Sequence, residues 1–205
     1  MDIDFMKFQK LFSILWKMKT VERWHGRYWD EYNLKRYESV SDHIWRMLMI
    51  LVYLEGKLSF RYDILHTIKI ILVHDLPEII TWDESAANPT SKYNNPASKK
   101  DKEEAERLAI HEIFREFDDS FSKESIVLWE EYEAGVTNEA KVAKCIDKLE
   151  AFMHGYETSN AHVFPEHLDF FTWMIDNQKG KLEDFDVLFE EIKQLFIKNY
   201  KPFEK

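Results

Sequence analysis

Glycine and proline are scarce in this chain, with five of each among 205 residues. β-Sandwiches and barrels need many tight turns, and these two residues supply many of the backbone conformations that such turns require. Apolar residues instead recur three and four positions apart in one segment after another, which is the spacing of amphipathic helices. The sequence therefore predicts an all-α fold without a β-sheet, a single-domain helical bundle that spans residues 1–205.

The apolar spacing also gives approximate positions for the helices. Pro77 disfavours helical geometry at Leu76, so one helix should end or bend at the pair His74-Asp75. Ser39 or Ser41 can cap the helix expected at 44–54, and a polar loop is expected at 84–98. Helices are expected at about 5–18, 44–54, 62–74, 99–117, 123–134, 138–156 and 182–196, with the C-terminal third holding at least this last one.

Net charge and cysteine content indicate which partners are unfavourable for this protein and which compartment it suits. The formal net charge of −10 makes binding to nucleic acid backbones unfavourable. No run of about 18 apolar residues is present, so no membrane span is expected. Cys145 is the only cysteine, which permits no internal disulfide and suits a reducing cytosol. The expected location is cytoplasmic.

Two histidines and two aspartates on three helical segments form a candidate metal site. His43 lies near the start of one predicted helix, the pair His74-Asp75 at the end of the next, and Asp147 on the apolar stripe of a third. Each residue alone is also typical of a buried histidine or a paired acid. Together they supply two imidazoles and two carboxylates without a thiolate, a donor set that suits a divalent ion and leaves positions open for substrate.

Three sequence blocks carry a resemblance to a known family. They are Glu38-Ser39-Val40-Ser41-Asp42-His43, then His74-Asp75-Leu76-Pro77-Glu78, then Ile146-Asp147-Lys148-Leu149-Glu150. In this order and at this spacing they resemble the HD-domain metal-dependent phosphohydrolases, and most closely the 5′-deoxynucleotidase branch. The resemblance covers about residues 8–156, and the helices of 157–205 remain unassigned.

The resemblance implies an HD-type helical bundle with one divalent ion, which could be Mn, Co, Mg or Zn. In the family, the positions of His43, His74, Asp75 and Asp147 bind the metal. The position of Glu78 handles the attacking water, so Glu78 is a candidate acid/base.

The same resemblance implies a nucleotide site beside the metal. Arg23 matches a residue that orients the phosphate, Trp24 one that lines the nucleotide pocket, and Asp83 one that contacts the deoxyribose. Trp82 departs from the family pattern, which commonly has glycine there, and the segment after Asp83 departs as well. Base and sugar preference are therefore the least transferable part of the resemblance.

The expected function is metal-dependent removal of the 5′-phosphate from (deoxy)nucleoside monophosphates. The alternatives are hydrolysis of another nucleotide, such as a cyclic or polyphosphorylated nucleotide or an alarmone, and a non-catalytic metal-binding regulatory module. A homodimer is possible because Phe170, Phe171 and Trp173 could form an interface. Those aromatic residues could equally complete the core of a monomer.

Overall fold

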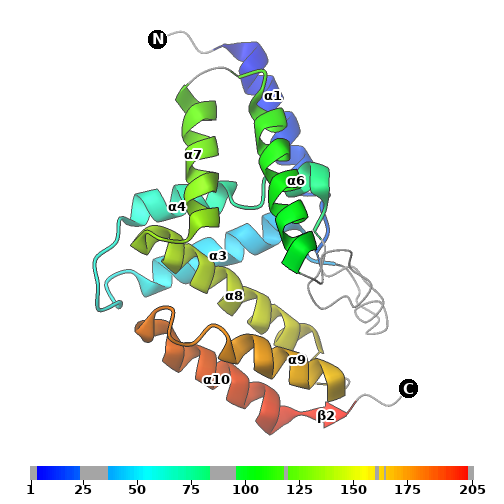
Figure 1. Ribbon diagram of the computed structural model, residues 1–205, viewed down its shortest axis with the longest axis vertical. Coiled ribbons are helices and arrows are strands. Elements are labelled where there is room, and N and C mark those ends of the chain that lie inside the picture. The colour runs from blue at the N-terminus through cyan, green and yellow to red at the C-terminus, as the bar shows by residue number, and fades with distance from the viewer. Residues whose placement is uncertain are drawn as a thin grey trace. The chain divides into compact units, whose positions relative to one another are not determined.

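A computed structural model describes residues 4–23, 37–83, 96–117, 120–159, 162–163 and 165–202 (Figure 1). Every regular element longer than two residues in these ranges is a helix, which confirms the all-α class. The chain divides into two compact units. The first comprises Met1–Trp45 and Lys69–Ala134, and the second comprises Arg46–Ile68 and Gly135–Lys205. The single-domain organisation stays a prediction.

The first unit consists of α1 (Phe5–Met18), the beginning of α3 (Val40–Leu54), the end of α4 (Ile64–Val73), α5 (Glu78–Thr81), α6 (Pro96–Phe114) and α7 (Ser120–Ala134). The short helix α5 packs against both α1 and α6, and α6 packs against α7. Ile70, Ile71, Ile110 and Trp129 are almost completely buried in its interior. These contacts fix the segment 74–83 on a rigid helical support.

Local capping explains where several helices begin. The Asp4 carboxylate accepts hydrogen bonds from the N–H groups of Met6 and Lys7 at the start of α1. The Asp63 carboxylate accepts one from His66 N–H at 3.0 Å and caps α4. Pro96 begins α6, where its missing N–H costs no helical bond. Helix α6 therefore begins at Pro96, three residues before the start at 99 that the apolar spacing predicts.

The second unit consists of the end of α3, the beginning of α4, α8 (Asn138–Ser159), α9 (Pro165–Asp176) and α10 (Glu183–Asn199). Helix α10 packs against α8 and α9. The ring of Phe171 stacks on that of Phe196 with centroids 4.8 Å apart, and Phe185 and Phe189 are fully buried. Phe171 therefore completes the core of this unit, whereas Trp173 is 59% exposed. The homodimer stays a prediction.

A small parallel pairing was not anticipated from the sequence. The two-residue strands β1 (His162–Val163) and β2 (Lys201–Pro202) pair in the register His162 with Lys201 and Val163 with Pro202. Segments this short leave no periodic signal in the sequence, and the pairing links the residues that precede α9 to those that follow α10.

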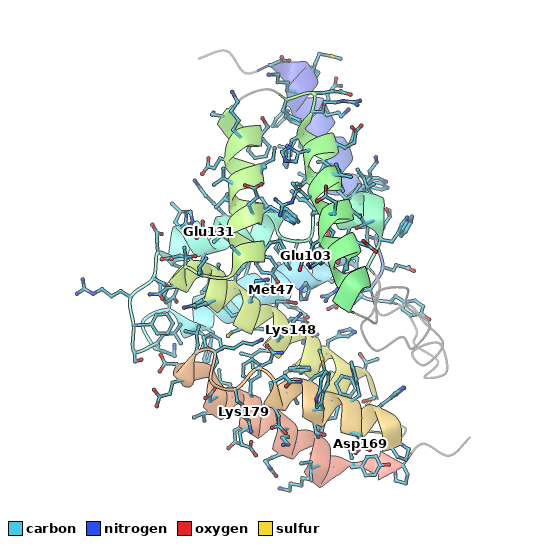
Figure 2. All side chains as sticks on the ribbon, in the orientation of Figure 1. Met47, Glu103, Glu131, Lys148, Asp169 and Lys179 are labelled. Atoms are coloured by element: carbon cyan, nitrogen blue, oxygen red, sulfur yellow. The ribbon has the colours of Figure 1, made fainter. Side chains whose placement is uncertain are left out.

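Burial follows the apolar spacing on α8 and α10, whereas α1 leaves Phe5, Phe8 and Phe12 exposed. Met47, labelled in Figure 2, is completely buried on α3, and Leu51 lies one turn further along and is also completely buried. None of the described helices is both long enough and apolar enough to cross a lipid bilayer.

Truncation of the buried aromatic core should destabilise the second unit. Phe185→Ala removes a fully buried ring and leaves a cavity, so we expect a loss of about 3–5 kcal/mol in the free energy of unfolding. Val187→Ala, on the same helix but 67% exposed, should change it by less than about 0.5 kcal/mol. Urea unfolding followed by circular dichroism measures both. Equal stability of the two variants would contradict the assigned burial of α10.

Candidate metal centre

His43 lies in the first turn of α3, where a side-chain cap fixes the start of the helix. The Asp42 carboxylate accepts hydrogen bonds from the N–H and hydroxyl of Ser39 at 2.9 and 2.8 Å, and the Asp42 N–H donates to the Ser39 hydroxyl at 3.2 Å. This reciprocal arrangement is a capping box. It confirms Ser39 as the cap and places the completely buried His43 one residue beyond the box.

The segment that carries Arg23 is held beside the start of α3 by backbone hydrogen bonds. The N–H of Arg23 donates to the carbonyl of Glu38 at 2.7 Å, and the N–H of Val40 donates to the carbonyl of Val21 at 2.9 Å. Glu22 and Ser39 form an antiparallel bridge between the same segments. Arg23 and His43 are thus positioned by one local structure, although they are 20 positions apart in the sequence.

His74 and Asp75 follow the end of α4, as the position of Pro77 predicts. The helix ends at Val73, and α5 begins at Glu78. The Nδ1 atom of His74 lies 2.8 Å from the carbonyl oxygen of Ile71, which fixes the proton on Nδ1 because a carbonyl can only accept. The lone pair of Nε2 is then available to a ligand. Such a backbone contact is a common way to orient a metal-binding imidazole.

The Asp75 carboxylate lies close to both imidazoles. Its Oδ2 atom is 3.1 Å from His74 Nε2 and 3.8 Å from His43 Nε2, and the two imidazole centroids are 5.7 Å apart. Burial alone would raise the pKa of Asp75. Favourable interactions with His74 and His43 and the charge of Arg23 outweigh that effect and hold the pKa of Asp75 below its usual range. Asp75 is therefore a carboxylate at neutral pH.

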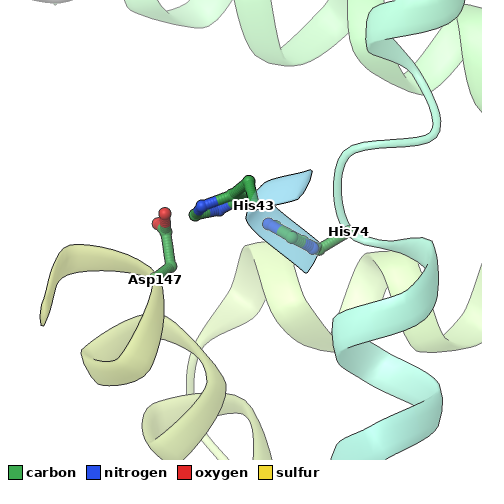
Figure 3. Close-up of side chains that lie close together, drawn as sticks. All are labelled: His43, His74 and Asp147. Carbon is green, nitrogen blue, oxygen red and sulfur yellow. The ribbon is translucent and has the colours of Figure 1, made fainter. Parts of the chain in front are cut away.

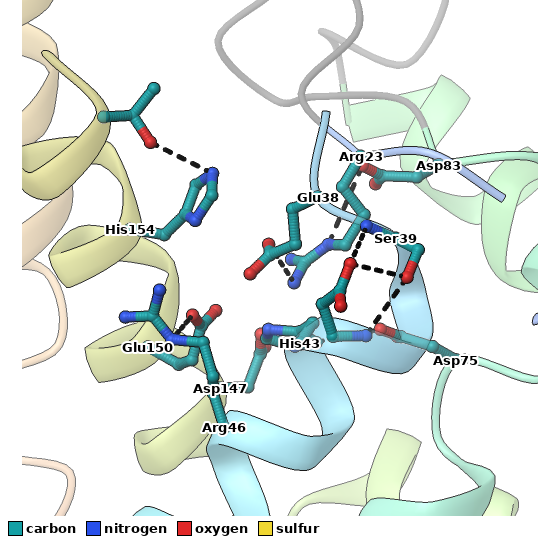
Figure 4. Close-up of polar contacts among 12 residues, drawn as sticks. Arg23, Glu38, Ser39, His43, Arg46, Asp75, Asp83, Asp147, Glu150 and His154 are labelled. Carbon is teal, nitrogen blue, oxygen red and sulfur yellow. Dashed lines mark hydrogen bonds and ion pairs between the residues drawn. The ribbon is translucent and has the colours of Figure 1, made fainter. Parts of the chain in front are cut away.

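Arg23 and Asp83, both predicted from the sequence, lie together in the first unit (Figure 4). Arg23 is buried, with NH1 3.4 Å from Glu38 Oε2 and Nε 3.9 Å from Asp83 Oδ2. The guanidinium is thus held between two carboxylates, which fixes its plane. Trp24, the third predicted substrate residue, lies outside the described residues.

Glu78 is buried at the first position of α5. Burial raises the pKa of its carboxyl group well above the usual value, and the neighbouring charges of Asp75 and Asp83 raise it further, whereas Arg23 and Lys102 oppose the shift. The sequence did not single out Lys102 or its neighbour Glu106. Their spacing of four residues on a helix was the available signal, but that spacing is common on solvated helix faces.

Asp147 belongs to the second unit. It is buried on α8, and Lys148 Nζ lies 2.7 Å from its Oδ2 atom. Arg46 Nε lies 2.9 Å from Oε1 of the fully buried Glu150, one turn further along the same helix (Figure 4). Arg46 Nη2 also lies 2.8 Å from Oε2 of Glu157. An acidic residue on a buried stripe is costly unless charge or metal offsets it, and α8 carries two.

The residue types fit a divalent metal ion. His43 and His74 of the first unit and Asp147 of the second unit, drawn in Figure 3, are all buried, and each offers a donor atom of a type that divalent ions accept. In the first unit, the imidazoles of His43 and His74 lie within 3.8 and 3.1 Å of the Asp75 carboxylate. Neutral imidazoles and carboxylates are the donors that Mn, Co, Zn and Mg accept to different degrees.

This chain is similar to known proteins over most of its length. The family model described as HD domain matches residues 16–184. The 5′-deoxynucleotidase HDDC2 of Dictyostelium discoideum is 34% identical over 153 residues, which is 72% of this chain and 75% of that protein. The 5′-deoxynucleotidase HDDC2 of Danio rerio is 34% identical over 161 residues, which is 78% of this chain and 74% of that protein.

The fold is shared with a solved structure. A predicted metal-dependent phosphohydrolase from Magnetospirillum magnetotacticum superposes with a TM-score of 0.73 and covers 94% of each chain, at 21% sequence identity. At that identity the likeness concerns the arrangement of the helices.

Trp82 has an unusual backbone conformation immediately before Asp83. Its φ of 64° and ψ of 154° lie in a region that is close to glycine-only, and it is the one described non-glycine residue with positive φ. The sequence departs from the family pattern here, because tryptophan stands where glycine is common. Trp82 therefore adopts a backbone conformation that is normally found only at glycine.

Replacement of Trp82 by glycine should relieve this strain. The Trp82 side chain is 60% exposed, so little packing is lost, and we expect Trp82→Gly to raise the free energy of unfolding by about 1 kcal/mol. Trp82→Ala is the matched control, because it removes the ring but keeps the strain. Thermal unfolding of the two variants distinguishes them. A glycine variant no more stable than the alanine variant would show that the conformation costs nothing.

Proposed function

The chain belongs to the HD domain family, and from this we propose that it is a metal-dependent phosphohydrolase that removes the 5′-phosphate from deoxynucleoside monophosphates. The observation that carries the proposal is the Asp75 carboxylate, kept ionised beside two imidazoles on a segment that also holds Glu78 and Asp83. Metal donors, an acid/base candidate and a polar sugar contact thus arise from ten consecutive residues, 74–83.

His43, His74 and Asp75 of the first unit would hold one divalent ion, with Asp147 as the fourth ligand that the sequence predicts. The chemistry of the donor set supports this assignment, because neutral imidazole and carboxylate ligands leave the ion able to accept oxygen ligands from a substrate. When bound, the ion supplies Lewis acidity that offsets charge on the phosphate and makes water more acidic. Mn, Co, Mg and Zn are the candidates.

Arg23 orients the phosphate. Its planar guanidinium presents paired N–H donors that match two phosphate oxygens, a geometry that lysine lacks. Glu38 and Asp83 hold that plane in position, so little side-chain entropy remains to be lost on binding. Trp24, the next residue in the chain, covers the nucleotide.

Glu78 serves as the acid/base. The raised pKa of its buried carboxyl group brings it closer to the operating pH, where proton transfer in either direction is efficient. The carboxylate form accepts a proton from the water whose oxygen forms the new bond to phosphorus. The protonated form then delivers that proton to O5′ as the P–O5′ bond breaks, which releases the nucleoside and phosphate.

Asp83 contacts the sugar. Its carboxylate accepts a hydrogen bond from a deoxyribose hydroxyl while its other interaction, with Arg23, fixes its position. A 2′-hydroxyl on the same ring is disfavoured, so the choice between deoxyribose and ribose depends on this residue.

The reaction is tested by phosphate release from each deoxynucleoside and ribonucleoside 5′-monophosphate, with the protein loaded with Mn, Co, Mg or Zn. We expect release from deoxynucleotides and loss of both activity and bound metal in His74→Ala and Asp75→Asn, because each removes one ligand. His111→Ala, an exposed histidine on α6, is the matched control and should retain both. Elemental analysis measures the metal.

Three results would count against the proposal. Equal metal content in the wild type and Asp75→Asn would remove Asp75 from the ligand set. Hydrolysis of a cyclic or polyphosphorylated nucleotide, with no monophosphate turned over under any metal, would favour the alternative phosphohydrolase. Absence of turnover with metal bound would favour a regulatory module.

Kinetic analysis should separate the roles of the substrate-facing residues. Glu78→Gln keeps the shape but cannot exchange a proton, so kcat should fall by about 100-fold or more with metal still bound. Arg23→Lys keeps the charge but loses the planar fork, so both KM and kcat should worsen. Asp83→Asn should mainly reduce the preference for deoxyribose. Wild-type kcat in metal-loaded Glu78→Gln would disprove the assigned acid/base.

A further inference from the structure

The carboxylates around the candidate centre outnumber the cations that face them. In the described part of the first unit, Asp75, Glu78 and Asp83 lie on one short segment, and Arg23 is already placed between Glu38 and Asp83. A phosphate monoester carries close to two negative charges at neutral pH. A divalent ion and Arg23 would offset part of the repulsion between these carboxylates and a phosphate ligand, and a further positive charge would offset more of it.

Lys102 supplies such a charge from a different helix. It lies on α6, which packs against α5, the helix that begins at Glu78. Its Nζ atom is 3.4 Å from Oε1 of Glu106, one turn further along α6, and the Glu106 side chain is 14% exposed. The Lys102 side chain is 30% exposed, so it is not sealed in the interior of the unit.

The electrostatic surroundings of Lys102 are those of the candidate centre. Burial alone would lower the pKa of its ammonium group, and Glu106 opposes that effect most strongly. The charges of Glu78, Asp83 and Asp75 act in the same direction, so the pKa is raised and the ammonium stays protonated. Lys102 acts on Glu78 in turn, because its positive charge lowers the pKa of the Glu78 carboxyl group, which burial and the neighbouring acids raise.

We propose that Lys102 is a second phosphate-binding cation of this site and that Glu106 is the positioning residue that holds its ammonium group toward Glu78 and Asp83. The proposal rests on the proposed function for the identity of the substrate. An ammonium group has three donors, and the single contact with Glu106 leaves donors for phosphate oxygens. Arg23 and Lys102 then bind the phosphate from two separate segments, 4–23 and α6.

The test uses the metal-loaded, full-length protein and inorganic phosphate as the probe. Lys102→Met should weaken phosphate binding, measured by calorimetry, by about tenfold, because one charge-assisted hydrogen bond is lost. Glu106→Gln should weaken it less, and Lys102→Arg should retain most of it. Lys100→Met is the matched control, since Lys100 is exposed on the same helix and its loss changes the net charge equally.

Kinetics and stability distinguish this role from a structural one. For a deoxynucleoside monophosphate, Lys102→Met should raise KM by about tenfold, whereas inhibition by the uncharged deoxynucleoside, bound metal and melting temperature should match the wild type. Phosphate affinity within about twofold of wild type in Lys102→Met, or an equal loss in Lys100→Met, overturns the proposal. If no monophosphate is hydrolysed, the proposed function fails, and calorimetry with inorganic phosphate still decides the role of Lys102.

Discussion

The carboxylate of Asp75 is the constraint on which the first unit depends. A buried charge is costly, and here that cost is offset by His74 at 3.1 Å, His43 at 3.8 Å and the charge of Arg23. A different local structure positions each of these partners. The capping box at Ser39 positions His43, and the end of α4 before Pro77 positions His74. The backbone hydrogen bond from Arg23 to Glu38 positions Arg23. The local structure at the start of α3 and the end of α4 is therefore arranged around one acidic side chain.

Charge balance follows from the same constraint. The chain carries a net charge of −10, and the centre adds several carboxylates at close range, which is unfavourable for an anionic substrate. The balance is local: a divalent ion, Arg23 and the Lys102 ammonium would offset a phosphate group where it binds. Because Glu78 also lies in this field, the cations moderate a pKa that burial and the neighbouring acids raise. Binding and proton transfer thus depend on the same few charges.

The helices and several candidate residues could be predicted from the sequence because their signals are local. Periodic apolar residues mark α8 and α10, and Pro77 marks the end of α4 beside His74. Lys102 could not be found in this way, because its importance comes from packing of α6 on α5, and no local pattern encodes that contact. The pairing of β1 with β2 was missed for the same reason. The predicted and observed starts of a helix differ where a side-chain cap, rather than the apolar spacing, sets the first turn. The helix expected at 44–54 begins at Val40, directly after the cap at Ser39.

The residues proposed to contact the phosphate and the sugar also interact with each other. Arg23, assigned to the phosphate, and Asp83, assigned to the sugar, form an ion pair, and the strained Trp82 directs the backbone into Asp83. A change at either partner alters the position and charge of the other, so the effects of the two on binding are not expected to add. Trp82 lies where the family commonly has glycine, and its backbone adopts a conformation that glycine adopts without strain. Under the proposed function, sugar preference should therefore depend on Trp82 and Arg23, which position Asp83, as well as on Asp83 itself.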